Sequence, residues 1–160
     1  LYVDKKTGLP NREKLNIYIG EMAGKVLPEA FTCFTLSLDN LSELTKRFGY
    51  TVGDGVLKDF AGLVQLMGDT EGMRGYNGVG RFVVFFEECS SKKAAAMIRI
   101  LDNQVEEYNS LNPEYPIRYT AAWATTEETD TYEIRELLRL SQKKWKQMEK
   151  EKKDKTEEET

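Results

Sequence analysis

Apolar residues recur every three or four positions along several stretches of the chain, which is the spacing of one buried face of an α-helix. The predicted helices run from Asn11 to Pro28, over 40–48, over 54–67, from Ser90 and Ser91 onward, and from Glu133 through Met148. Asn11 and Ser90 are residue types preferred at helix N-caps, and Asp130 with Glu133 resembles a capping box. The first apolar stripe comprises Leu15, Ile19, Met22 and Val26.

Continuous apolar runs bounded by turn residues indicate β-strands. The predicted strands are 31–38, 73–76, 81–88 and 117–126, the second and third joined by a turn at 77–80. This order of elements predicts an α+β fold of the ferredoxin-like type, with a mostly antiparallel central sheet and flanking helices. The first and third strands are antiparallel neighbours in that topology. A site is therefore expected where Ser37 and Asp39 face the hairpin turn.

Composition suits one domain of 160 residues with its own core. The net charge of −4 gives no reason to expect a nucleic-acid partner. No apolar run reaches the roughly 18 residues of a membrane span, so we expect no membrane contact from this segment. Cys33 and Cys89 lie in apolar runs and are interpreted as buried residues. We assign 1–150 to the domain and the charged residues 151–160 to a fraying, solvated tail.

Three segments resemble the signature motifs of bacterial GGDEF domains. Residues 4–12 read DKKTGLPNR and are similar to the D-x-L-T-G-L-P-N-R opening of that family. Residues 38–57 resemble its D-x-D-x-F-K-x-I-N-D-x-x-G-H-x-x-G-D-x-x-L segment, and residues 78–82, GVGRF, fall where the family has Gly-Gly-Asp/Glu-Glu-Phe. The resemblance covers residues 3–150 and implies the diguanylate cyclase fold, a nucleotidyl-cyclase palm.

Active members of that family condense two GTP molecules into cyclic di-GMP at a Mg²⁺ site. The resemblance places the two metal-binding acids of the family at Ser37 and Gly80, and the next hairpin acid at Arg81. Mg²⁺ requires hard oxygen ligands, and a guanidinium beside it would repel it. We therefore expect no catalytic residues, no metal site and no cofactor in this chain.

The other nucleotide contacts of the family also differ here. They fall on Ser42, Thr45, Tyr50, Met148 and Lys152. Asp39 remains, although its counterpart is not the principal metal ligand, and Asp54 remains where the family contacts guanine. Asp54 and Arg81 are the candidate vestigial nucleotide-binding residues, while a structural role for Asp54 at a helix N-terminus is the alternative. Trp123 stands where the family has Gly, and it either crowds the site or fills the core.

The family's inhibitory product site uses an R-x-x-D motif shortly before the hairpin. The aligned residues here are Asp69-Thr70-Glu71-Gly72, with an acid in place of the Arg. An acidic side chain repels a phosphodiester. We expect no such site.

The resemblance leaves three functional hypotheses. The first is a catalytically inactive regulatory or interaction module of a bacterial signalling protein, working through other domains, a protein partner or a homodimer. The second is a guanine-nucleotide sensor without turnover, binding GTP weakly at most, and the third is an active diguanylate cyclase. Leu1 is not methionine, which fits a piece of a longer protein. The expected location is the cytoplasm, either free or as the cytoplasmic part of a membrane-anchored sensor.

Overall fold

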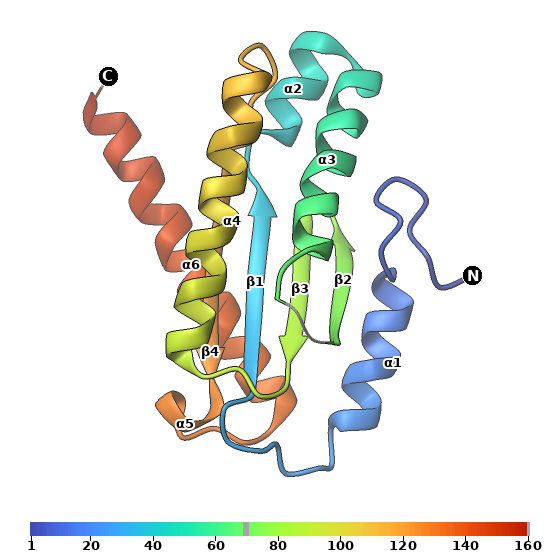
Figure 1. The fold of residues 1–160 in the computed structure, drawn as a ribbon, viewed down its shortest axis with the longest axis vertical. Helices are drawn as coiled ribbons and strands as arrows, with labels where there is room; N and C mark the ends of the chain where they lie inside the picture. Colours follow the sequence, from blue (N-terminus) through green and yellow to red (C-terminus); the bar gives the residue numbers. More distant parts are fainter. Residues whose placement is uncertain (69–70, 160) are drawn as a thin grey trace.

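Four antiparallel strands form one sheet in the computed structural model, which describes residues 1–68 and 71–159 (Figure 1). The elements in chain order are α1 (Arg12–Met22), β1 (Thr32–Leu38), α2 (Leu41–Phe48), α3 (Tyr50–Gln65), β2 (Gly72–Gly78), β3 (Arg81–Phe86), α4 (Ser91–Leu111), β4 (Tyr119–Thr125), α5 (Thr126–Thr129) and α6 (Ile134–Glu159). This arrangement confirms the predicted α+β class with a central antiparallel sheet and flanking helices.

The strand order is β2-β3-β1-β4, with β1 in the centre of the sheet beside β3 and β4. The predicted pairing of the first and third strands is confirmed, because Ser37 lies opposite Arg81 in the register of β1 and β3. On the other side of β1, Ser37 lies opposite Thr120 of β4. Three strands therefore meet at the end of β1.

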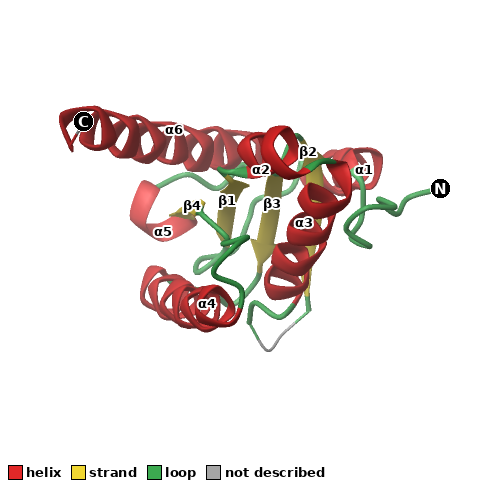
Figure 2. Cartoon of the chain, turned by 90° about the horizontal axis from the view of Figure 1, so that it is seen from above, coloured by secondary structure: helices red, strands yellow, loops and turns green. Residues whose placement is uncertain are grey.

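Helices cover both faces of the sheet, with α3 and α4 on one face and α1 and α6 on the other (Figure 2). Alternate residues of β1 divide between the faces, as the period of two in a strand requires. Phe34 and Leu36 belong to the larger core under α3 and α4. Cys33 belongs to the smaller core under α1 and α6, where burial raises the pKa of its thiol to about 12. The interpretation of both cysteines as buried residues is confirmed.

The helix N-caps predicted at Asn11 and Ser90 are confirmed. The Asn11 side chain accepts a hydrogen bond from the Lys14 amide, and the Ser90 hydroxyl accepts one from the Lys93 amide. The predicted end of the first helix is wrong, because α1 ends at Met22 and Val26 is 85% exposed. Beyond Met22 no strongly apolar stripe faces the sheet, so packing does not extend the helix.

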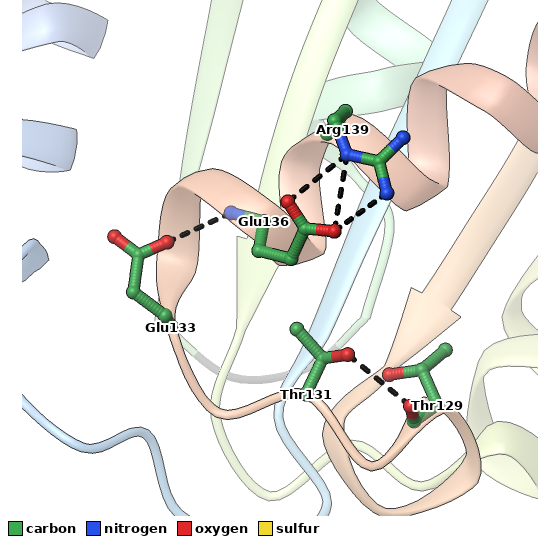
Figure 3. A network of polar contacts seen from close by, with 5 residues as sticks. All are labelled: Thr129, Thr131, Glu133, Glu136 and Arg139. Atoms are coloured by element: carbon green, nitrogen blue, oxygen red, sulfur yellow. Dashed lines mark hydrogen bonds and ion pairs between the residues drawn. The ribbon is translucent and has the colours of Figure 1, made fainter.

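The predicted capping box of the last helix is also wrong. Asp130 adopts a left-handed conformation, with φ of 52°, and ends the short helix α5. Asp tolerates this conformation better than most residues because its short polar side chain bonds locally. Glu133 alone caps α6, accepting a hydrogen bond from the Glu136 amide at 2.8 Å (Figure 3).

The charged C-terminal residues are helical and not a frayed tail. Helix α6 continues to Glu159 and projects beyond the sheet in Figure 1, with residues 151–158 exposed. Pairs four residues apart support it, such as Lys153 with Glu149 at 3.7 Å. Over the described residues, no helix combines the length and apolarity that crossing a membrane demands.

Candidate functional site

A hollow of about 470 Å³ opens at the end of β1, between the β2–β3 turn, α2 and α6. Its lining residues are Ser37, Leu38, Asp39, Leu41, Ser42, Thr45, Lys46, Tyr50, Val79, Arg81, Trp145 and Glu149. Sequence reasoning predicted a site at this place in the fold. The lining includes Ser37 and Arg81, aligned with two of the family's acids, and Ser42 and Thr45, aligned with two of its nucleotide contacts. Gly80, aligned with the other metal-binding acid, is not among the lining residues.

The hydroxyl of Ser37 is the centre of a hydrogen-bond network. It accepts a hydrogen bond from Nε1 of Trp145 at 2.7 Å and donates to Oδ1 of Asp39 at 2.6 Å. The second carboxylate oxygen of Asp39 accepts from the Thr120 hydroxyl at 2.5 Å. Lys152 donates to the Thr120 hydroxyl at 3.1 Å and to the carbonyl oxygen of Tyr119 at 2.7 Å. The network connects β1, β4 and α6.

Trp145 was predicted only as one apolar position on the last helix. In the structure its indole is 6% exposed and lies against the end of β1. The Arg81 guanidinium stacks over the indole, 4.7 Å from the ring centroid. Helical spacing predicted the burial of Trp145, but its contact with Ser37 joins residues 108 positions apart in the sequence.

Trp123, the tryptophan considered in sequence reasoning, lies on the opposite face of the sheet. Its ring packs 6.3 Å from that of Phe34, and its Nε1 donates to the Ser91 hydroxyl at 3.4 Å. It belongs to the surroundings of the larger core. The interpretation of Trp123 as a core residue is confirmed, and Trp145 is the indole at the site.

The β2–β3 turn has a backbone that disfavours a side chain at Gly80. Val79 and Gly80 have φ values of 54° and 73°. Strand β2 extends through Gly78, so the predicted turn at 77–80 is too long. The Gly80 amide donates to the Tyr76 hydroxyl at 2.8 Å. A Cβ at Gly80 would lie 3.1 Å from the carbonyl oxygen of Leu38, and L-residues rarely adopt this φ.

Asp54 is not among the residues that line the hollow. It is the fifth residue of α3, whose N-cap is Gly49, so it is not in the first turn as the structural interpretation required. Its carboxylate forms an ion pair with Lys6 of the N-terminal loop at 3.4 Å. Of the two candidate nucleotide-binding residues, only Arg81 lines the hollow, and a joint role in binding stays a prediction.

The model of the diguanylate cyclase GGDEF domain family matches residues 1–155. The chain belongs to the GGDEF family. Among solved structures, the fold resembles a diguanylate cyclase/phosphodiesterase from Caldicellulosiruptor saccharolyticus, at 18% identity and TM-score 0.72, over 94% of this chain and 88% of that one. It also resembles the FimX GGDEF domain from Pseudomonas aeruginosa, at 18% identity and TM-score 0.73, over 89% and 90%.

A third similar structure places a GGDEF domain inside a longer chain. It is the S helix-GGDEF-EAL segment of Vibrio cholerae LapD bound to c-di-GMP, at 14% identity and TM-score 0.63, over 78% of this chain and 29% of that one. Comparison with curated protein sequences found no match. The solved structures support the GGDEF fold of this chain.

The side chains present at this GGDEF site do not fit Mg²⁺. Ser37 and Gly80 supply no carboxylate, and both carboxylate oxygens of Asp39 already accept hydrogen bonds. Glu149 lines the hollow but pairs with Lys153. Within 1–68 and 71–159, no group of three or more His, Cys, Asp or Glu side chains is arranged to hold a metal ion. Mg²⁺ needs several oxygen ligands in near-octahedral geometry.

The aligned inhibitory site is only partly visible. Asp69 and Thr70 lie outside the described residues. Gly72 is the first residue of β2, opposite Phe86 of β3. The absence of an inhibitory site stays a prediction.

Proposed function

We propose that this GGDEF domain makes no cyclic di-GMP and serves as a regulatory or interaction module of a larger signalling protein. The observation that carries the proposal is the hydrogen bond from Trp145 to Ser37, with Arg81 stacked on the indole. A buried indole is hydrogen-bonded to Ser37, which aligns with one of the family's metal-binding acids, and the guanidinium of Arg81 replaces the next hairpin acid. Diguanylate synthesis depends on metal-stabilised phosphoryl transfer.

Restoring one acid is not expected to restore activity. A glutamate at Gly80 would need a strained backbone, and its Cβ would press on the Leu38 carbonyl. Ser37 would still lack a carboxylate, and Arg81 would still carry a positive charge. The domain therefore departs from an active site at three neighbouring positions.

Its proposed setting is a multidomain cytoplasmic protein, or the cytoplasmic part of a membrane-anchored one. The LapD segment, with an S helix and an EAL domain around its GGDEF domain, supports such an arrangement. A homodimer or a separate protein partner would use the same module.

The test is the amount of cyclic di-GMP formed from GTP by the purified domain with Mg²⁺ or Mn²⁺, separated by chromatography. We expect none above a no-protein control, and none from Gly80→Glu. An active GGDEF domain assayed in parallel establishes the detection limit. Product that grows with the concentration of this domain would refute the proposal and favour an active cyclase.

A further inference from the structure

A second hollow, of about 250 Å³, lies between α6 and the β2–β3 hairpin. Its lining residues are Thr35, Asn77, Arg81, Phe82, Val83, Gln142, Trp145 and Lys146. Arg81 and Trp145 line both hollows, so their stacked pair forms the wall between them. Arg81 apart, the second hollow is lined by none of the positions aligned with family site residues, which are Ser37, Ser42, Thr45, Tyr50, Asp54, Gly80, Met148 and Lys152.

Cationic side chains line the second hollow, and no acidic side chain lines it with them. Arg81 and Lys146 contribute two full charges, and no Asp or Glu lines it. Arg81 makes its cation–π contact with Trp145, but in the described part of the chain neither cation has an anionic partner. Asn77 and Gln142 add side-chain amides that make no hydrogen bond to described residues. Such a group of donors favours an anion.

The guanidinium of Arg81 is held in place before any ligand arrives. It stacks on Trp145, whose Nε1 is itself fixed by the Ser37 hydroxyl. Stacking uses the face of the guanidinium and leaves the N–H groups at its edge available. Because the side chain is ordered beforehand, binding loses less conformational entropy. Two mobile surface lysines would lose more conformational entropy on binding the same anion.

We propose that this hollow binds a small phosphate-bearing anion. Two cations and two amides match a group with three acceptor oxygens and nearly two negative charges, as a phosphomonoester has near pH 7. A carboxylate brings one charge and two oxygens, and satisfies fewer of these donors. The volume suits a phosphate group with a small substituent and not a polymer.

Inorganic phosphate is the probe, titrated at constant ionic strength in chloride. Trp123→Phe leaves Trp145 as the only indole, so tryptophan emission reports on the wall of the hollow. We expect a saturable change with a midpoint of about 1 mM or below, and a midpoint for acetate about tenfold higher because one charge is missing. A small phosphomonoester, glycerol phosphate, tests whether the hollow takes more than the free ion. If it fails to saturate while inorganic phosphate does, free phosphate is the ligand.

Matched variants separate a site from general charge. Lys146→Gln should raise the phosphate midpoint about fivefold, since one charge-assisted contact is lost. Lys144→Gln removes the same charge two positions earlier on α6, from a residue that does not line the hollow, and should leave the midpoint unchanged. Side-chain amide shifts of Asn77 and Gln142 in NMR spectra provide a second measure. A response linear in phosphate, or equal effects of the two lysine variants together with unmoved amides, would overturn the proposal.

Discussion

Trp145 brings three elements together at one side chain. It stands on α6, donates to Ser37 of β1 and lies under Arg81 of β3. The Ser37 hydroxyl in turn donates a hydrogen bond to the Asp39 carboxylate. At the residue scale, a chain of hydrogen bonds runs from Trp145 through Ser37 and Asp39 to Thr120. Removing one member leaves buried polar groups without partners.

Trp145→Phe and Trp145→Ala should have different costs in the free energy of unfolding. The Phe variant keeps most of the packing and loses the bond to Ser37, a cost of about 1–2 kcal/mol. The Ala variant also leaves a cavity, a cost of about 3–5 kcal/mol. Urea unfolding followed by circular dichroism measures both. Trp123→Phe is the control, because the hydrogen bond from Nε1 of Trp123 to Ser91 is long, at 3.4 Å. An Ala variant as stable as the unmodified domain would mean that α6 does not pack at the site in solution.

Sequence reasoning located this site but not its contents. Topology alone brought Ser37 opposite Arg81, because antiparallel neighbours fix the register. Aligned motifs identified the missing acids. The contacts of Trp145, Thr120 and Lys152 could not be predicted, since they depend on how α6 crosses the sheet. A periodic stripe says which face of a helix is buried and not which residue it meets.

At the element scale, α2 and α3 approach each other most closely at Gly53. A Cβ there would lie 2.3 Å from the Thr45 hydroxyl oxygen, whereas Gly55 in the same helix has open space around it. Glycine costs helix stability relative to alanine, by about 0.5–1 kcal/mol. Gly53 is therefore present for the close contact, while Gly55 is free of that constraint.

Gly53→Ala and Gly55→Ala should shift stability in opposite directions. The first forces Thr45 to move and should destabilise the domain by about 1–3 kcal/mol. The second should stabilise it by about 0.5–1 kcal/mol, because the unfolded chain loses freedom. Thermal unfolding of the two variants beside the unmodified domain gives both signs. If both variants stabilise the domain, the α2–α3 contact is looser than the structure has it.

Elements with strong apolar periodicity were predicted well, and their ends less well. The buried face of α3, which includes Leu57 and Phe60, follows directly from spacing. The prediction at Asp130 was wrong because Asp is favoured both at helix starts and at left-handed helix ends. Which of the two forms depends on the surrounding chain. Residues 151–158 have no apolar face, so pattern alone indicated a tail, while an existing helix extends into them at little cost.

At the scale of the whole molecule, α6 joins the site to the part of the chain that projects from the domain. Its first half packs on the sheet through Ile134 and Leu137, and its middle holds Trp145. Lys152 donates hydrogen bonds to Tyr119 and Thr120 of β4. A displacement of Ser37 at the end of β1 would therefore alter the contacts of α6 through Trp145.

The stability of the whole domain also reports on any nucleotide that it binds. We expect a dissociation constant for GTP no lower than about 0.1 mM, because Asp54 pairs with Lys6 and does not line the hollow that Arg81 lines. A ligand that binds only the folded state then adds at most about 1.4 kcal/mol at about 1 mM GTP. For a chain of this size that raises the melting temperature by no more than about 6 °C.

Mg²⁺ should leave that shift unchanged or reduce it, because the ion neutralises the phosphates that Arg81 would contact and finds few oxygen ligands of its own. Thermal unfolding with GTP, with ATP, and with each plus Mg²⁺ measures the effect, and titration calorimetry gives the affinity directly. ATP is the matched control, since it has the same phosphates and another base. Equal shifts for both nucleotides would point to phosphate contacts alone. Micromolar GTP affinity that strengthens with Mg²⁺ would contradict the inactive assignment and favour a nucleotide sensor or an active cyclase.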